Sequence, residues 1–300
     1  MLGKILVGTC SWTDASLVKD SDFYPARARS AEDRLQYYQS QFDVVEVDSS
    51  YYAIPSDINS RLWVERTGPD FIFDIKAFRL FTGHQTPLGA LPSDIKGSLP
   101  ANIVHRKSNL YMRDMPAELI DELWKRFKNA LAPLKDADKL GVVLFQFPPW
   151  FGFGRQQFDH ILYCKSMLTR HDLAIEFRNS SWLNDRNRGE TIDFLLRNNL
   201  SFVCVDEPQG FKSSVPPIAE ATSDMALVRY HGRNTQMWES KRATANQRFN
   251  YRYSEQELKE WVPRIKRLAE NTKQVHVLFN NHYRDKAVSN ARQMKILLGQ

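Results

Sequence analysis

Eight short apolar stretches recur along the chain, and each ends in polar or charged residues placed at every second position. Between them lie longer segments whose apolar residues recur at the three- and four-residue spacing of an amphipathic helix. Strands that alternate with helices are typical of parallel β/α folds, and eight such units predict a (β/α)8 barrel of the TIM type. The expected strands occupy residues 4–12, 43–52, 71–79, 140–149, 173–182, 200–208, 226–234 and 275–283.

The helical segments carry recognisable start signals. Ser30 with Asp33, and Ser254 with Glu257, have the spacing of a capping box, in which each side chain bonds the backbone N–H of the other residue. Pro116 suits the first turn of a helix whose apolar positions recur every fourth residue. These signals support the alternation of strands and helices that the barrel requires.

One connection is much longer than the others. Residues 80–115, between the third expected strand and the next helix, are rich in Pro, Gly and polar residues. A connection that follows a strand lies on the catalytic face of a β/α barrel, where long loops often act as lids. The segment is therefore either a lid or a surface excursion that covers a hydrophobic patch. Residues 207–224 are expected to be mostly irregular. No linker divides the chain, so we expect residues 1–300 to form one domain.

Polar residues at the strand ends share one parity, although a strand buried on both faces should be almost wholly apolar. Side chains alternate across a strand, and the side that faces the helices must be apolar. We therefore expect the polar parity to face the lumen and the mouth at the carboxyl ends of the strands. The residues that share a face are Glu46 and Asp48, Asp74 and Lys76, Glu176 and Arg178, Cys204 and Asp206, Arg229 and His231, and Asn280 and His282.

These charges allow a structural and a functional interpretation. Buried charges are costly unless they are paired, and a layer of ion pairs would hold the barrel in register. In that layer Glu176 would pair with Arg178 or Arg229, and Asp74 with Lys76. The functional interpretation is favoured for the whole set, because this many charges exceed what register alone requires.

We therefore predict a polar site at the mouth. Carboxylates, a lysine and histidines in such a site serve acid–base chemistry when their pKa values are moved apart. The catalytic candidates are Glu46, Lys76, Glu176, Asp206, His231 and His282. Arginine forks suit carboxylate or phosphate, and aromatic rings stack on a sugar or a base. The candidates for substrate binding are Trp12, Tyr52, Arg79, His84, Gln146, Arg178, Trp182, Arg229, Arg233, Asn280 and Asn281.

Composition adds little to this picture. A chain of 300 residues with 42% hydrophobic and 25% charged residues is typical of a globular protein. No apolar run approaches the about 20 residues that span a membrane, so no membrane partner is expected. We find no secretory signal, and the three cysteines have no CxxC spacing, which predicts a cytoplasmic location. The net charge of +6 permits an anionic substrate and supports nucleic acid only weakly, because no zinc-finger or RNA-recognition signature is present.

Cofactor signals are few. The chain contains no GxGxxG or P-loop fingerprint, so nucleotide cofactors bound in those ways have no support and the cofactor stays unknown. The side chains suited to zinc or manganese are His84, His231, His282, Glu176 and Asp206. No HxH or HExxH spacing brings them together, and we assign no metal ligands. A divalent metal held by residues from different strands stays an alternative.

A set of ordered motifs spans nearly the whole chain. They are GTCSW (8–12), FYP (23–25), VEVDSSYYAIP (45–55), FDIKAFRLFTGHQ (73–85), FQFPPWF (145–151), EFRNSSW (176–182), VDEP (205–208), VRYHGRN (228–234), YRYS (251–254) and FNNHYRDKAVSNA (279–291). With these motifs the chain resembles the YecE-like family, catalogued as domain of unknown function 72. The resemblance implies a TIM-type barrel and leaves the activity unassigned. The chain departs from the family pattern at Asn179, where His is frequent, at Asp48, where Asn is usual, and at Cys10-Ser11, where Ser-Gly is usual.

The expected function is an enzyme that acts on a small anionic or sugar-like substrate by acid–base chemistry, as a hydrolase or a lyase/isomerase. In this hypothesis Glu176 or Asp206 is the general acid or base, with His231 or His282 as its proton partner. Two alternatives remain open at this point. One is a metal-dependent phosphodiesterase or endonuclease-like enzyme, and the other is a non-catalytic ligand-binding or scaffold barrel.

Overall fold

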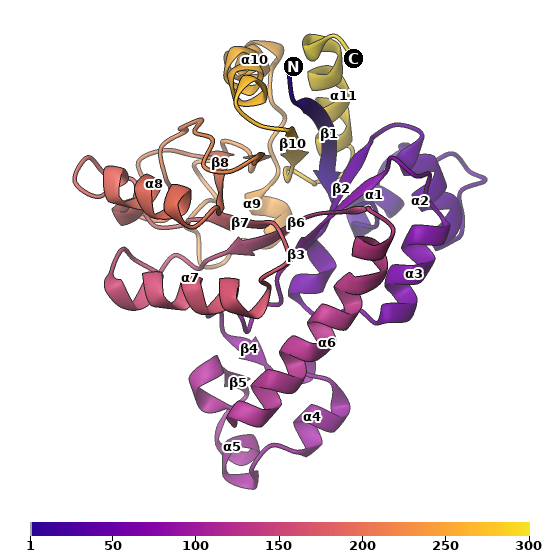
Figure 1. Cartoon of the computed structure of the whole chain (residues 1–300). Helices are drawn as coiled ribbons and strands as arrows, with labels where there is room; N and C mark the ends of the chain where they lie inside the picture. Colours follow the sequence, from indigo (N-terminus) through magenta and orange to yellow (C-terminus); the bar gives the residue numbers. More distant parts are fainter. Residues whose placement is uncertain (1) are drawn as a thin grey trace.

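The computed structural model describes residues 2–300, which form a closed parallel barrel surrounded by helices (Figure 1). Eight strands, each overlapping its predicted stretch, are hydrogen-bonded in the order β1-β10-β9-β8-β7-β6-β3-β2. The predicted (β/α)8 barrel is thereby confirmed. The barrel strands are β1 (Lys4–Cys10), β2 (Val44–Val47), β3 (Ile72–Lys76), β6 (Leu140–Gln146), β7 (Leu173–Glu176), β8 (Ser201–Asp206), β9 (Met225–Tyr230) and β10 (Gln274–Phe279).

Helices cover the outside of the barrel. The capping boxes predicted at Ser30 and Ser254 are both formed, and the longest helix begins one residue after Pro116, which is its N-cap. No helix in residues 2–300 is both long enough and apolar enough to cross a membrane. The α-helices are α1 (Ala15–Lys19), α2 (Ala31–Gln39), α3 (Asp57–Glu65), α4 (Ser93–Gly97), α5 (Ala101–Arg106), α6 (Ala117–Asp136), α7 (Arg155–Met167), α8 (Arg188–Arg197), α9 (Ala245–Arg248), α10 (Glu255–Glu270) and α11 (Lys286–Leu298).

The long connection after β3 is more ordered than its composition suggests. It contains α4 and α5 and an antiparallel pair, β4 (Thr86–Pro87) with β5 (Asn109–Leu110), and it extends below α6 in Figure 1. Its side chains Leu91, Ile95 and Leu99 are buried and belong to the hydrophobic core. This burial supports the interpretation that the excursion covers apolar surface, while its action as a lid stays a prediction. The segment between β8 and β9 has no helix or strand, as expected.

The lumen contains a buried polar pair that was not expected. Asp74 on β3 accepts a hydrogen bond from the backbone N–H of Val142 at 2.8 Å and lies 2.8 Å from Nδ1 of His276 on β10. Asp74 and His276 are both fully buried. The predicted pairing of Asp74 with Lys76 is therefore wrong, because the imidazole reaches Asp74 from across the lumen. Gly141 leaves the space that this pair occupies, since a Cβ there would lie 2.1 Å from Oδ1 of Asp74.

The substitution Gly141→Ala should therefore destabilise the protein. The added methyl group must displace the buried carboxylate or the strand, and overpacking of this kind costs about 1–3 kcal/mol. Urea denaturation followed by circular dichroism measures the difference. Gly97→Ala is the matched control, because a Cβ on Gly97 meets nothing within 4 Å. Equal stability of the two variants would contradict the role given to Gly141.

Candidate active site at the barrel mouth

Arg229, fully buried at the end of β9, is the centre of the upper layer of the lumen. Its guanidinium donates to both oxygens of Glu46 on β2, at 2.8 Å each, and to Oε2 of Glu176 on β7. Cys10 on β1 lies beside this pair, with its thiol donating to Glu46 at 3.4 Å. Both expected pairings of Glu176 are thus present, because Nη1 of Arg178 also lies 3.4 Å from Oε1 of Glu176, while Arg229 joins Glu176 to Glu46.

Glu176 also receives hydrogen bonds on its second oxygen. Nε2 of Gln146 donates to Oε1 at 2.7 Å, and Nε2 of His231 lies 3.0 Å from the same atom. Burial opposes ionisation of this carboxyl, but Arg229 and His231 hold the pKa of Glu176 well below its usual range. Burial also lowers the pKa of His231 to about 3. His231 is therefore neutral, and a proton on Nε2 directed at Glu176 leaves Nδ1 to accept from Asn280 at 3.0 Å.

Three further cations lie above this layer, and aromatic rings hold them. The ammonium of Lys76 is 4.8 Å from the ring centre of Tyr51, and the guanidinium of Arg79 is 5.1 Å from the same ring. Arg178 lies 4.5 Å from the ring of Trp238. Throughout the described chain, neither Lys76 nor Arg79 has a carboxylate within ion-pairing distance. The mouth therefore contains positive charge that the protein itself does not neutralise.

The pKa of His84 reflects the electrostatic potential at the mouth. It is partly buried, and its ring lies edge-on to Tyr51 at 5.2 Å. Burial lowers the pKa of His84 to about 3. The charges that add to this shift are all positive and come from Lys76, Arg79 and Arg178. His84 is therefore neutral at physiological pH, because the potential around it is positive.

Two carboxyl groups at the mouth are shifted towards their protonated forms. Burial raises the pKa of Glu207 to about 8 and also raises the pKa of Asp48. Oε1 of Glu207 accepts the backbone N–H of Val215 at 2.8 Å. Oε2 of Glu207 is buried without a hydrogen bond, 3.6 Å from Nε of Arg178, which also lacks one. Glu207 is therefore a protonated acid near neutral pH, and its unbonded oxygen lies at the mouth.

Asp206 does not face the lumen, which corrects the expected parity of β8. Its carboxylate accepts from Nε1 of Trp261 at 2.7 Å and from the hydroxyl of Tyr253 at 2.8 Å, on the helix side of the barrel. Arg233 pairs with Asp206 and with residues of α10, so it also lies outside the mouth. Neither Asp206 nor Arg233 contributes to the candidate site.

Glu207 takes the place that was given to Asp206. In the register of the sheet Val205 lies beside Arg229, and strand alternation puts Glu207 on the same side as Val205. The sequence carried little signal for this choice, because Cys204 and Val205 are both apolar enough to face either way. The register with β9 and the hydrogen bonds of Asp206 with Trp261 and Tyr253 separate the two parities.

Both tryptophans predicted to bind substrate are core residues. Trp12 packs edge-on against Trp63 of α3 at 5.8 Å and is almost fully buried. Trp182 is fully buried and stacks on Phe177 at 4.2 Å. The prediction that these two side chains line the mouth is therefore wrong. They fill the space between the barrel and the helices, which favours large apolar rings. Tyr51 and Trp238 are the aromatic residues that contact the cations of the mouth.

The remaining candidates lie at the edge of the site or outside it. Asn281 is fully buried and donates to the backbone of Tyr251 and to Asn290, so it positions a loop. Tyr52 is exposed at the surface. His282 donates from Nδ1 to the carbonyl of Asn280 and is close enough to Asp48 for their charges to interact. Of these, His282 and Tyr52 border the mouth, since Tyr52 packs edge-on against Tyr51 at 5.0 Å.

The departures from the family pattern have local structural effects. Asn179 caps a short 3₁₀ helix (Ser180–Trp182) by accepting from the N–H of Ser181 at 2.9 Å. Ser11 has a φ of 96°, in the region that favours glycine, which is the residue usual at that position in the family. A strained residue therefore follows β1 directly at the mouth.

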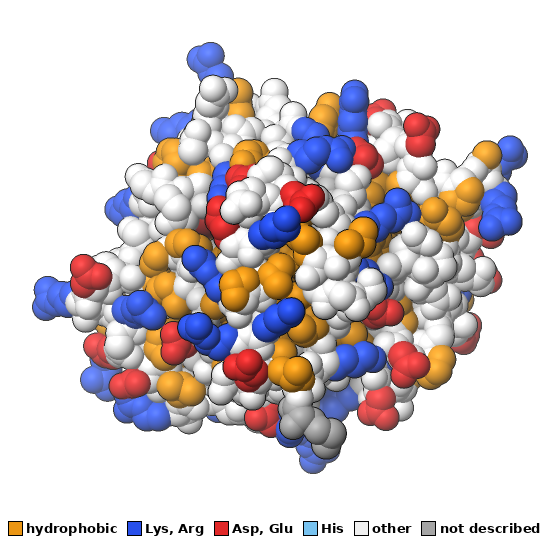
Figure 2. Space-filling model, turned by 90° about the horizontal axis from the view of Figure 1, so that it is seen from above, with side chains coloured by type: hydrophobic (Ala, Val, Ile, Leu, Met, Phe, Trp, Pro, Cys, Tyr) orange, Lys and Arg blue, Asp and Glu red, His pale blue; other side chains and the backbone are white. Residues whose placement is uncertain are grey.

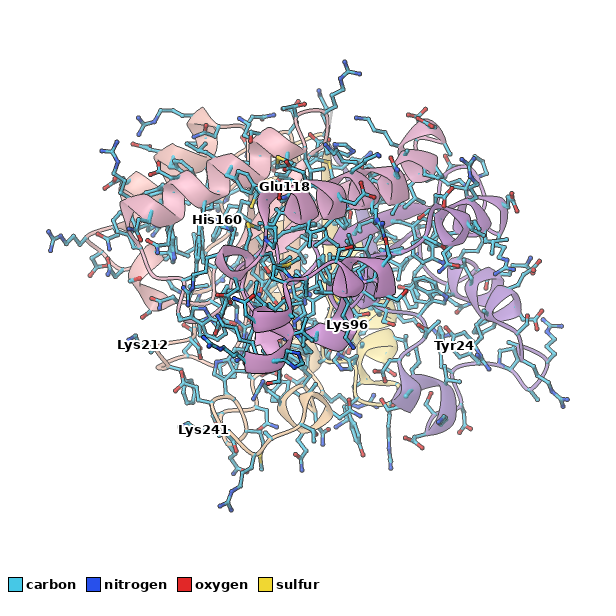
Figure 3. All side chains as sticks on the ribbon, turned by 90° about the horizontal axis from the view of Figure 1, so that it is seen from below. Tyr24, Lys96, Glu118, His160, Lys212 and Lys241 are labelled. Atoms are coloured by element: carbon cyan, nitrogen blue, oxygen red, sulfur yellow. The ribbon has the colours of Figure 1, made fainter. Side chains whose placement is uncertain are left out.

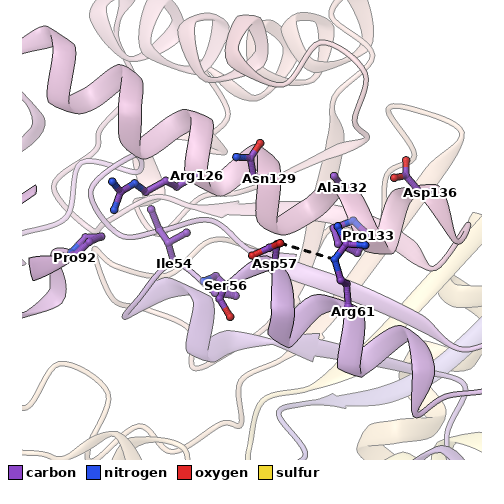
Figure 4. Close-up of a pocket in the computed structure, with 11 residues that line it drawn as sticks. Ile54, Ser56, Asp57, Arg61, Pro92, Arg126, Asn129, Ala132, Pro133 and Asp136 are labelled. Carbon is purple, nitrogen blue, oxygen red and sulfur yellow. Dashed lines mark ion pairs between the residues drawn. The ribbon is translucent and has the colours of Figure 1, made fainter. Parts of the chain in front are cut away.

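The cations of the outer groove between α3 and α6, by contrast, are paired with carboxylates. This groove has a volume of about 560 Å³ (Figure 4), and there Arg61 pairs with Asp57 while Arg126 pairs with Asp94. On the face shown in Figure 2, Lys and Arg are interspersed with Asp and Glu. The labelled, exposed lysines of Figure 3 come from α4 and from the loops after β8 and β9, and they are Lys96, Lys212 and Lys241. In residues 2–300 no three His, Cys, Asp or Glu side chains form a group suited to a metal.

Comparison with known proteins gives a consistent result. A family model described as "Protein of unknown function DUF72" matches residues 6–300. The chain is 35% identical to the UPF0759 protein YunF of Bacillus subtilis (strain 168), over 98% of this chain and 94% of that protein. A solved DUF72 family protein from Enterococcus faecalis V583 is 26% identical, with coverage of 99% and 96% and a TM-score of 0.79. Another, from Thermotoga maritima MSB8, is 28% identical, with coverage of 99% and 100% and a TM-score of 0.75.

Replacement of Arg229 by Met should destabilise the fold strongly. The change leaves Glu46 and Glu176 buried without their common cation, and breaking a buried pair in this way costs about 3–5 kcal/mol. Thermal and urea unfolding measure the loss. The variant Arg61→Met, on the exposed pair with Asp57, is the control and should change stability by less than about 1 kcal/mol. A similar small effect of Arg229→Met would show that the cluster is not required.

Replacement of Glu207 by Gln should stabilise the protein, and more so as the pH rises. The folded-state pKa of about 8 exceeds the ordinary 4.5, so folding takes up a proton between these values and Glu207 becomes increasingly destabilising. We expect a gain of about 4 kcal/mol at about pH 8 and about 1 kcal/mol at about pH 5, measured by urea denaturation. The exposed Glu65→Gln is the control. A gain that does not depend on pH would contradict the protonated state of Glu207.

Proposed function

The chain belongs to the DUF72 family of proteins of unknown function, and because this family assigns no activity we propose one from the site. We propose an enzyme that binds a small anionic substrate at the barrel mouth and acts on it by acid–base chemistry. The family membership confirms the resemblance that the motifs indicated. The substrate class and the reaction are our proposal.

One observation carries the proposal. The charges that act appreciably on His84 are all positive and come from Lys76, Arg79 and Arg178. Arg178 lies 3.4 Å from Glu176 and 3.6 Å from Glu207, whereas Lys76 and Arg79 form no ion pair in the described residues. Like charges held together repel one another, and an anion among them relieves this repulsion. Guanidinium groups bind carboxylate and phosphate through paired N–H donors. An anionic group of the substrate would therefore be held by Arg79 and Arg178.

The proton chemistry is assigned differently from the sequence-based hypothesis. Glu176 forms an ion pair with Arg229 and a hydrogen bond with His231. These residues therefore position the other groups of the site. Glu207 is the better proton donor, since it is protonated near neutral pH and has a free oxygen beside Arg178. Asp48, beside Lys76, is a second carboxyl whose pKa is raised. Tyr51, which is partly exposed, offers its ring to a sugar-like part of the substrate.

Anion binding is the first test of this function. Calorimetric titration with inorganic phosphate, sugar phosphates and small carboxylic acids should give saturable binding to the native protein. Loss of a charge-assisted hydrogen bond in Arg79→Gln should weaken that binding about 10-fold or more. Arg79 makes no ion pair in the described residues, so its loss should leave stability nearly unchanged.

Arg61→Gln is the matched control, because it removes an arginine from the outer groove between α3 and α6. This variant should bind like the native protein. Turnover of a bound compound should fall in Glu207→Gln while its binding persists. Absence of binding by all three classes of anion, or unchanged binding in Arg79→Gln, would refute the proposed function.

A further inference from the structure

Lys76 has no assigned partner in the site, and its surroundings suit a covalent role. We propose that Lys76 is a nucleophile that forms an imine with the aldehyde or ketone group of a substrate that also carries a phosphate or carboxylate. The inference rests on the proposed function, because the anionic group of that substrate would be bound by the cations of the same mouth. It narrows the substrate from any small anion to an anionic carbonyl compound.

The geometry leaves the amine of Lys76 available. Lys76 ends β3 and shares the lumen-facing parity of Asp74, so its side chain enters the site from the barrel wall. The oxygens of Glu46 are both held by Arg229, and those of Glu176 by Arg229 and its neighbours. Among the described residues the Nζ of Lys76 therefore forms no hydrogen bond or ion pair, and it lies against the ring of Tyr51.

Lys139 is a buried lysine with a structural role, and its hydrogen bonds distinguish it from Lys76. Its Nζ donates to the backbone carbonyls of Val64 and Thr67, at 2.7 Å each, and to the hydroxyl of Thr67 at 3.0 Å. Those bonds occupy all three ammonium donors and tie β6 to the end of α3. Lys76 has no comparable bonds, although it is also partly removed from solvent.

The electrostatic environment increases the nucleophilicity of Lys76. Burial and the charge of Arg229 lower the pKa of Lys76, and the nearby carboxylates only partly oppose this shift. A lower pKa increases the fraction of neutral amine, the form that attacks a carbonyl carbon. An adjacent permanent cation is a recognised means of activating a lysine.

The chemical step balances with groups at the mouth. The lone pair of Nζ forms a bond to the carbonyl carbon, the C=O π electrons move to oxygen, and one proton passes from nitrogen to that oxygen to give a carbinolamine. A second proton, supplied by a neighbouring carboxylic acid, leaves with the hydroxyl group as water, and the C=N⁺ bond forms. Burial raises the pKa of the nearby Asp48, which favours this carboxyl as the source of that proton, and the proton returns when the imine is hydrolysed. No oxidant or reductant is needed.

An imine changes the reactions that the site can perform. The positive nitrogen accepts electrons from a bond to the adjacent carbon, which favours proton transfer or carbon–carbon cleavage at that carbon. Glu207 can then exchange a proton with the substrate while Arg79 and Arg178 hold its anionic end. The inference therefore favours a lyase or isomerase over a hydrolase.

Pyridoxal 5′-phosphate is a direct probe, because it combines an aldehyde with a phosphate. After incubation with the native protein and reduction by borohydride, peptide mass spectrometry should find the adduct on Lys76 at least about 10-fold above Lys139 and the exposed Lys212. Pyridoxine 5′-phosphate, which has an alcohol in place of the aldehyde, should bind and suppress that labelling. Lys76→Met should lose the adduct and still bind pyridoxine 5′-phosphate.

The results with pyridoxal 5′-phosphate and pyridoxine 5′-phosphate distinguish a failure of this inference from a failure of the proposed function. Binding of pyridoxine 5′-phosphate without preferential labelling of Lys76 would overturn the inference and leave the proposed anion site standing. Labelling of Lys76 that pyridoxine 5′-phosphate does not suppress would overturn the anionic substrate class. Neither binding nor labelling would overturn both. Labelling of Lys76 that the alcohol analogue suppresses would support both.

Discussion

The cluster of Arg229 with Glu46 and Glu176 is the interaction on which the rest of the site depends. It crosses the lumen and joins β9 to β2 and β7, strands that are not neighbours in the sheet. Charges buried this deeply are tolerated only when paired and hydrogen-bonded, and here Gln146 and His231 complete the bonding of Glu176. The same pairing occupies the carboxylates that would otherwise neutralise the cations above them. A structural cluster in the lumen thus produces a positive mouth.

Burial then determines the protonation states around this mouth. His84 and His231 are neutral, Glu207 holds a proton, and the ammonium of Lys76 is more easily deprotonated than an exposed one. Each shift has desolvation as its largest cause, because the charged form of each group loses contact with water. The result is a site with neutral acids and bases beside permanent cations. Of these groups, Glu207 has the pKa, about 8, that suits proton exchange at physiological pH.

The relation to the DUF72 family establishes the fold and leaves the chemistry to the site. Solved members at 26% and 28% identity share the barrel over almost the whole chain. A barrel of this type supports many reactions, so the activity must be argued from particular side chains. Near the mouth, Ser11 has a positive φ and Asn179 caps a short 3₁₀ helix. The departure at Asp48 adds a carboxyl group beside Lys76.

Much of the architecture was readable from local patterns. The eight strands and the capping boxes at Ser30 and Ser254 follow from period-two and helical spacing, which are properties of a few adjacent residues. The parity of β8 was not readable, because its alternate residues are apolar in both directions. The pattern alone therefore located the mouth but put Asp206 there in place of Glu207.

By itself, the amino-acid sequence determined the barrel, the end at which its chemistry lies and most of the charged groups found there. The tertiary structure decided which charges neutralise one another, because partners such as Arg229 and Glu46 are 183 residues apart and meet only across the lumen. It also decided that Trp12 and Trp182 fill the core, since burial depends on the surrounding helices. Protonation at the mouth follows from those same long-range contacts, which no local pattern encodes.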